Sequence, residues 1–225
     1  MNNTIFELKN VNKEYKTKVE IIEVLKNISL ELNQGDFISI QGKSGSGKTT
    51  LLNIIGLLDT PTTGEIKFDN EIINYADEKI KNMIRNQKIG FVFQFHYLLN
   101  EFTALENVLM PTRISGKNEK ESMDKAFLLF EELHIAHRIQ HKPKELSGGE
   151  AQRVAVARAL FNSPKIIFAD EPSGNLDSVS AKNLHELFFT LREKFNQTFV
   201  IVTHNQELAE MADRKLEMKD GRIIN

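Results

Sequence analysis

A glycine-rich segment has the spacing of a phosphate-binding loop. Residues 42–49 read Gly-Lys-Ser-Gly-Ser-Gly-Lys-Thr, which fits G-x-x-x-x-G-K-[ST] at every fixed position. Glycine lets the backbone turn its N–H groups towards a phosphate, and the start of a following helix adds partial positive charge. Lys48 would reach the β- and γ-phosphates, and Thr49 would offer its hydroxyl to Mg²⁺. The residues predicted to bind a nucleotide here are Gly42, Lys43, Ser44, Gly45, Ser46, Gly47, Lys48, Thr49 and Thr50.

A second segment supplies the acidic groups that such chemistry needs. The apolar run 166–169 ends in Asp170 and Glu171. Asp170 would hold Mg²⁺ through its water shell, and Glu171 would orient or deprotonate the attacking water. Taken alone, the pair could also cap a strand end before Pro172. The phosphate loop makes the catalytic interpretation the favoured one.

A third segment predicts another anion site. Ser147, Gly148 and Gly149 precede the helical run 151–160, and a helix start offers free N–H groups together with the serine hydroxyl. This site lies about a hundred residues after Lys48. Because one nucleotide does not need two phosphate cradles in one chain, we expect the second to close on the γ-phosphate held by another copy.

Alternating strands and helices must position these residues. Short apolar runs at 36–41, 88–93, 165–169 and 198–203 have the character of buried parallel strands. Residues 4–8 and 24–32 alternate as strands do, and 51–58 and 180–194 have helical patterns. The stretch 101–161 is rich in helix formers and has no strand pattern. The order predicts an α/β domain with an inserted helical segment.

Composition narrows the class of protein. The chain has 225 residues, 29 basic and 31 acidic, and a net charge of -2, which argues against a nucleic-acid module. It has no cysteine, so disulfides and zinc-thiolate sites are excluded. No run of about 18 apolar residues occurs, so any membrane role would come through a partner. His134, His137 and His141 lack acidic or cysteine partners nearby in the sequence, and we expect a solvated surface there, with no metal other than Mg²⁺.

The motifs together resemble the ATP-binding-cassette (ABC) ATPases over nearly the whole chain. The resemblance implies one ABC ATPase domain over residues 1–225: an α/β P-loop NTPase (RecA-like) core, an N-terminal antiparallel β region and an α-helical subdomain at about 95–162. It implies ATP and Mg²⁺ as cofactors, with Mg²⁺ at Thr49, Gln94 and Asp170. Catalysis would involve Lys48, Gln94, Glu171 and His204. Tyr15 resembles the aromatic residue that stacks on adenine, and Asp177 belongs to the segment 173–177 that matches the family's D-loop.

The family also implies partners and a location. We expect a homodimer on ATP binding and separate integral membrane permease subunits, which would place the chain peripherally at the cytoplasmic face of the inner membrane. Residues 51–59, 61–65, 89–94 and 103–108 resemble the branch that includes lipoprotein-releasing ATPases and macrolide or peptide exporters. Release of lipoproteins is the leading expectation. Export of macrolides or antimicrobial peptides, and a non-transporting cassette of the cell-division type, remain alternatives.

Overall fold

The chain is described by a computed structural model that covers residues 4–116 and 119–224. Its centre is a sheet of six strands in the order β10-β9-β3-β8-β7-β6. The strands are β3 (Phe37–Gln41), β6 (Ile89–Phe93), β7 (Ile166–Asp170), β8 (Thr198–Val202), β9 (Arg214–Lys219) and β10 (Arg222–Ile223). All neighbouring pairs are parallel except β9 and β10.

The register of this sheet brings the predicted site together at one edge. Phe93 pairs with Asp170, and Asp170 pairs with Val202, so β6, β7 and β8 end level with one another. The residues that follow these strand ends are therefore neighbours in space. Strand β3 also runs parallel to β8, so the loop that follows Gln41 leaves the sheet at the same edge. Ligands of open α/β sheets bind at this carboxyl edge.

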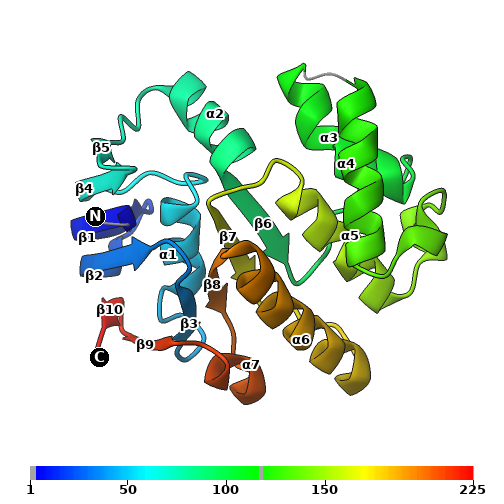
Figure 1. Ribbon diagram of the computed structural model, residues 1–225. Helices are drawn as coiled ribbons and strands as arrows, with labels where there is room; N and C mark the ends of the chain where they lie inside the picture. The colour runs from blue at the N-terminus through cyan, green and yellow to red at the C-terminus, as the bar shows by residue number, and fades with distance from the viewer. Residues whose placement is uncertain (1–3, 117–118, 225) are drawn as a thin grey trace.

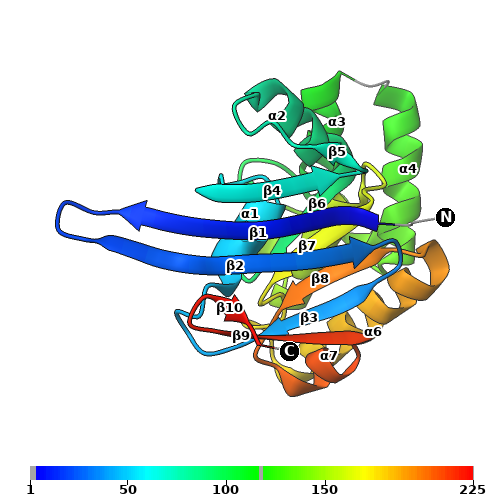
Figure 2. The ribbon, with the colours of Figure 1, turned by 90° about the vertical axis from the view of Figure 1, so that its left-hand side faces the viewer.

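A second, antiparallel sheet has the order β2-β1-β4-β5. It contains β1 (Thr4–Lys16), β2 (Ile21–Asn33), β4 (Thr63–Phe68) and β5 (Glu71–Ile72). Figure 2 shows β1 and β2 as one long hairpin that projects beyond the rest of the molecule. The strands expected at 4–8 and 24–32 are both longer than predicted, because pairing continues through the mixed polar residues near the turn, where Thr17 N donates to Glu20 O at 2.9 Å.

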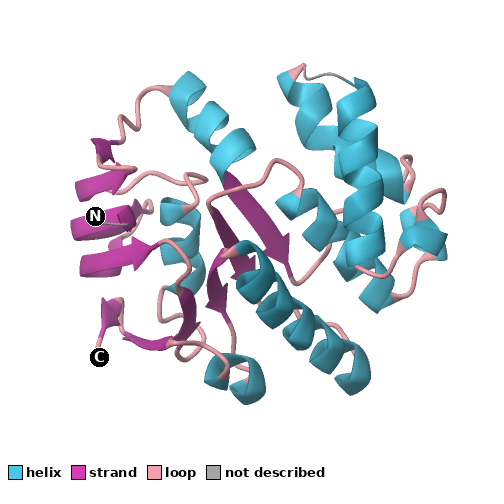
Figure 3. Cartoon of the chain, in the orientation of Figure 1, coloured by secondary structure: helices cyan, strands magenta, loops and turns pink. Residues whose placement is uncertain are grey.

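Helices surround the central sheet (Figures 1 and 3). Helix α1 (Lys48–Ile55) follows the glycine-rich loop, and α6 (Ser178–Phe195) packs beside the sheet. Between β6 and β7 the described residues form α3 (Ala104–Ser115), α4 (Glu119–Glu132), two 3-10 turns (Ala136–Arg138 and Pro143–Glu145) and α5 (Gly148–Leu160), with no strand. The remaining helices are α2 (Glu78–Lys88) and α7 (Gln206–Glu210).

Two apolar clusters hold the layers together. One joins the antiparallel sheet and α1 to the central sheet, where the Phe6 ring lies 4.9 Å from Phe68 and 6.0 Å from Phe168. The other joins the opposite face of the central sheet to α3, α5 and α6, with Phe188 and Phe199 at 5.2 Å. Since β7 contributes to both clusters, the strand that carries Asp170 is buried on both faces and has a fixed position. In residues 4–116 and 119–224, no helix has both the length and the apolar character required to cross a bilayer.

Candidate functional site

The glycine-rich loop adopts a backbone that glycine alone allows without strain. Gly42, Gly45 and Gly47 have φ of 152°, 77° and 102°, all in the positive region. A Cβ atom on Gly42 would lie 2.3 Å from the carbonyl oxygen of Met218, so this turn has no room for a side chain. Gly47 caps α1, which leaves the first N–H groups of that helix free for an anion.

The side chains of Lys48 and Ser46 are two hydrogen-bond donors of this loop. The Lys48 ammonium curls back and donates to the carbonyl oxygens of Gly42 at 2.8 Å and Lys43 at 3.0 Å. The buried Ser46 hydroxyl has no hydrogen-bond partner among the described residues. Because a buried hydroxyl without a partner is costly, a phosphate oxygen in the loop would satisfy it. The residues present therefore fit a nucleotide phosphate.

Asp170 lies at the end of β7 against the start of α1. Burial raises the pKa of the Asp170 carboxyl, and the Glu171 charge raises it further, although the Thr49 hydroxyl and the Lys48 ammonium lower it. Accumulated negative charge in a buried place is relieved by a cation. Carboxylate and hydroxyl oxygens suit Mg²⁺, so the predicted metal residues Thr49 and Asp170 fit that ion.

Glu171 and His204 come from separate segments of the sequence and contact each other in the structure. His204 Nδ1 lies 2.8 Å from Glu171 Oε1, and the His204 backbone N–H donates to Glu171 Oε2 at 3.3 Å. Glu171 has φ of 46°, an uncommon conformation for a residue with a side chain. Its backbone N–H donates to Val202 O at 2.8 Å, which anchors this conformation to β8. Strain of this kind concentrates at functional sites, and here it accompanies a carboxylate that contacts the His204 imidazole.

Gln94 follows β6 and is bound to the segment predicted as a D-loop. Its Nε2 donates to Asn175 Oδ1 at 2.9 Å, and Asn175 Nδ2 donates back to Gln94 O at 3.2 Å. A Cβ atom on Gly174 would lie 2.9 Å from Gln94 Nε2, so the two segments touch closely. This bond uses the amide nitrogen of Gln94, whereas a metal would be bound by its amide oxygen, so the role of Gln94 as a metal ligand stays a prediction. The sequence placed Asn175 in the segment that matches the D-loop but gave no sign of its contact with Gln94, which lies 81 residues away.

Tyr15 lies beside the phosphate loop although it comes from the long hairpin. Its phenol oxygen donates to Asp59 Oδ2 at 2.6 Å, and Thr50 at the start of α1 is close enough to affect its ionisation. The Tyr15 side chain remains partly exposed. An aromatic face is therefore available next to the anion site, as adenine stacking requires.

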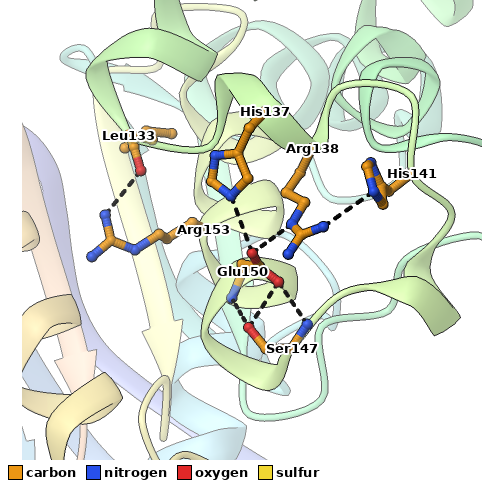
Figure 4. A network of polar contacts seen from close by, with 7 residues as sticks. All are labelled: Leu133, His137, Arg138, His141, Ser147, Glu150 and Arg153. Atoms are coloured by element: carbon orange, nitrogen blue, oxygen red, sulfur yellow. Dashed lines mark hydrogen bonds and ion pairs between the residues drawn. The ribbon is translucent and has the colours of Figure 1, made fainter.

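The Ser147 segment begins α5 and is rigidly held (Figure 4). Ser147 N–H and its hydroxyl donate to Glu150 Oε2 at 2.8 and 2.9 Å, and Glu150 N–H donates to Ser147 Oγ at 3.3 Å. This capping box leaves the N–H groups of Gly148 and Gly149 at an open helix start. Glu150 also accepts from Arg138 Nε at 2.6 Å and lies 3.3 Å from His137 Nε2.

The capping network supplies polar partners for two of the histidines. His137 is exposed, but it has an acidic neighbour in Glu150, and Arg138 NH1 lies 3.1 Å from His141 Nε2. His137 and Arg138 lie in a 3-10 turn and Glu150 lies at the start of α5, and no local sequence pattern indicates that the two segments meet. In the part of the chain that the structure describes, no group of three or more acidic, cysteine or histidine side chains could hold a metal ion.

The structure thus assembles part of the predicted site within one chain. The phosphate loop, Tyr15, Asp170, Glu171 and His204 lie at one edge of the central sheet, whereas α5 lies in the helical region away from α1 (Figure 1). Asp177 caps α6 by accepting from the N–H groups of Val179 and Ser180 at 3.0 Å, so its part in nucleotide binding stays a prediction.

A groove opens between the central sheet and α3, close to the end of β6. Its volume is about 290 Å³. Its lining is largely apolar, with two arginines, and comprises Arg85, Asn86, Ile89, Gly90, Phe91, Phe93, Met110, Pro111, Ile114, Arg158, Ala159 and Asn162. Arg158 donates to the carbonyl oxygens of His96 and Tyr97 at 2.8 and 2.7 Å, which ties the wall of the groove to the segment after Gln94.

Comparison with known proteins decides the family. Residues 25–174 match the family described as ABC transporter. The chain belongs to the ABC transporter family. This confirms the ABC ATPase predicted from the motifs. A solved dimeric bacterial ABC transporter cassette is 44% identical and has a TM-score of 0.90, covering 98% of this chain and 97% of that one. This similarity confirms the predicted fold class.

Curated relatives of this ABC protein carry a more specific name. The "Lipoprotein-releasing system ATP-binding protein LolD" of Cytophaga hutchinsonii is 56% identical over 203 residues, covering 90% of this chain and 93% of the relative. The protein of the same name from Porphyromonas gingivalis is 48% identical over 221 residues, covering 98% and 99%. A second solved cassette dimer, in a post-hydrolysis state with ADP and Pi, is 43% identical, covers 98% of this chain and 97% of that one, and has a TM-score of 0.89.

Proposed function

We propose that this ABC ATPase hydrolyses ATP with Mg²⁺ to power a separate membrane permease that releases lipoproteins from the inner membrane. The observation that carries hydrolysis is the contact between Glu171 and His204 at 2.8 Å, next to the phosphate loop. The substrate class rests on the LolD relatives at 56% and 48% identity. The chain itself would reach the membrane only through the permease.

The residues of one chain divide the work of hydrolysis. The free N–H groups of the loop and Lys48, once released from the carbonyls of Gly42 and Lys43, bind the phosphates. Thr49 and Asp170, joined by the amide oxygen of Gln94, would hold Mg²⁺, which would neutralise charge developing on the phosphate oxygens. Glu171 accepts a proton from the attacking water, and His204 fixes the orientation of the Glu171 carboxylate.

Two chains would complete each site. The helix start at Ser147, Gly148 and Gly149 offers free N–H groups, and α5 lies in the helical region away from α1 (Figure 1). In a head-to-tail dimer each helix start contacts the γ-phosphate bound to the other copy. ATP is then a shared ligand that holds the dimer closed, and its hydrolysis lets the dimer open. The dimeric state of two similar solved cassettes supports this arrangement.

The groove beside α3 would receive a short cytoplasmic helix of the permease. Its apolar lining suits the apolar face of an amphipathic helix. Arg158 links the groove to the segment after Gln94. Closure around ATP would therefore move the bound permease helix.

Reconstitution tests the proposed substrate. The chain and its permease would be placed in proteoliposomes that carry a fluorescent triacylated lipoprotein, and release to the aqueous phase would be measured after addition of ATP and Mg²⁺. We expect ATP-dependent release with the wild-type chain and none with Glu171→Gln. ATP hydrolysis stimulated by the permease without any release of lipoprotein would contradict the proposed substrate and leave the ATPase intact.

A further inference from the structure

Three groups fix the orientation of the Tyr15 ring. Its hydroxyl donates to Asp59 Oδ2 at 2.6 Å, and the Lys13 ammonium lies 4.7 Å from the ring centroid. Thr50 adjoins the phenol from α1. A ring held by a hydrogen bond at its tip and a cation over one face has little freedom to rotate. The cation covers one face, so a ligand would stack on the other.

Asp59 and Lys13 are also bound to each other. Lys13 Nζ donates to Asp59 Oδ1 at 2.7 Å and to Thr60 O at 2.7 Å. Lys13 is buried, with 8% of its surface exposed, so these two partners replace the water that its ammonium group would otherwise bind. Asp59 uses one carboxylate oxygen for the lysine and the other for the tyrosine. It is therefore the centre of the cluster.

The cluster is anchored to the helix that follows the phosphate loop. The N–H groups of Leu58 and Asp59 donate to Asn53 O in α1 at 2.8 and 3.1 Å, and Thr60 N–H donates to Asp59 Oδ1 at 2.6 Å. Helix α1 thus places an anion site at its first turn and a fixed carboxylate just beyond its last. The distance between the phosphates and an aromatic ring held by Asp59 is set by one rigid element.

We infer that Asp59 is a positioning residue for the adenine base, which acts by holding the Tyr15 ring in its stacking orientation, with Lys13 on the opposite face. The inference rests on the proposed nucleotide site and adds to it the residue that orients the base contact. Burial raises the pKa of the Tyr15 phenol, and its hydrogen bond to Asp59 raises it further, in agreement with the geometry.

The test compares ATP with inorganic tripolyphosphate, which has the phosphates but no base. Both dissociation constants are measured by calorimetry with Mg²⁺ for the wild type, Asp59→Ala, Asp59→Asn, Tyr15→Ala and Tyr15→Phe. In Asp59→Ala the Tyr15 side chain is no longer held in place and must be ordered when ATP binds, so we expect about a two- to tenfold loss of ATP affinity. Tripolyphosphate affinity should not change, and Asp59→Asn, which can still accept from the phenol, should recover part of the loss.

A matched control and a spectroscopic readout separate positioning from a general structural effect. Asp69→Asn breaks a similar pair, with Lys165 at 2.6 Å, that does not contact Tyr15, so it should leave both ligands unaffected. Absorbance titration of the phenols, with Tyr15→Phe as reference, should show a lower Tyr15 pKa in Asp59→Ala. In the Tyr15→Phe background, Asp59→Asn should cause no further loss of ATP affinity.

The failures of the two proposals are distinguishable. If Tyr15→Ala binds ATP as well as the wild type does, the proposed base contact is wrong. If Tyr15→Ala weakens ATP but Asp59→Ala does not, the base contact stands and the positioning role of Asp59 is overturned. Equal losses for ATP and tripolyphosphate in a folded Asp59→Ala protein would also overturn it, because Asp59 would then support the phosphate loop.

Discussion

Removing the charge of Glu150 should destabilise the Ser147 helix start in a pH-dependent way. Hydrogen bonds from Ser147 and Arg138 outweigh the effect of burial and lower the pKa of Glu150 to about 2, from an ordinary value of 4.5. Taken in full, that shift corresponds to about 3 kcal/mol, since one pKa unit is about 1.4 kcal/mol. Solvent screening of this partly accessible site reduces the expected effect of Glu150→Gln to roughly 1–2 kcal/mol.

The sign of the pH dependence follows from the lowered pKa. The ionised carboxylate stabilises the folded chain fully above the unfolded value near 4.5, and the stabilisation is lost as pH falls towards 2. The difference in the free energy of unfolding between wild type and Glu150→Gln should therefore be largest at pH 7 and smaller at pH 3.5. Glu150→Ala, which also loses the capping box, should cost about 1 kcal/mol more.

Urea unfolding followed by circular dichroism measures these differences. Glu145→Gln is a matched control, because Glu145 accepts from Lys142 N–H at 2.7 Å in the neighbouring 3-10 turn but has no arginine partner in the contacts described. Its destabilisation should be smaller than that of Glu150→Gln. Equal stability of Glu150→Gln and wild type at pH 7 would refute the reasoning. So would a difference in the free energy of unfolding that does not become smaller in acid.

Two further predictions concern the nucleotide and the membrane. Lys48→Ala should abolish hydrolysis and weaken ATP binding, since charge-assisted hydrogen bonds contribute about 1.5–3 kcal/mol each; calorimetry that gave an unchanged dissociation constant would reject the assignment of the loop. In cells the chain should sediment with the inner membrane only when its permease is present, because no described helix can cross a bilayer. Membrane sedimentation in a strain without candidate permeases would argue against the coupling groove.

Residues close together in the sequence were the ones that could be predicted. The loop 42–49 and the pair at 170–171 have local spacings that their chemistry dictates, and the buried strands that carry them are short apolar runs. Contacts between distant segments left no local signal. Asp59 meets Tyr15 across 44 residues, and the long hairpin that carries Tyr15 continues through residues too polar to read as strand.

The same limit applies to smaller elements. The helix Glu78–Lys88 and the strand Arg214–Lys219 were not predicted, since both consist mainly of polar residues and owe their form to the sheets beside them. Ser147, Gly148 and Gly149 were predicted to start a helix, but the partners of Glu150 at that helix start, Arg138 and His137, come from the preceding 3-10 turn. Tertiary contacts, and not local propensity, decide such positions.

Dimer formation by Glu171→Gln, with and without Ser147→Arg, tests the composite site most directly. Glu171→Gln keeps the shape of the site but removes the base, which should cost at least about 10²–10⁴ in rate, so ATP stays bound. Light scattering after size exclusion should then show twice the 25.7 kDa of one chain in the presence of ATP. The double variant should bind ATP and remain monomeric, because the arginine occupies the place of the partner's γ-phosphate. Loss of ATP binding by the monomeric double variant would contradict the account, since Ser147 would then serve its own chain's nucleotide.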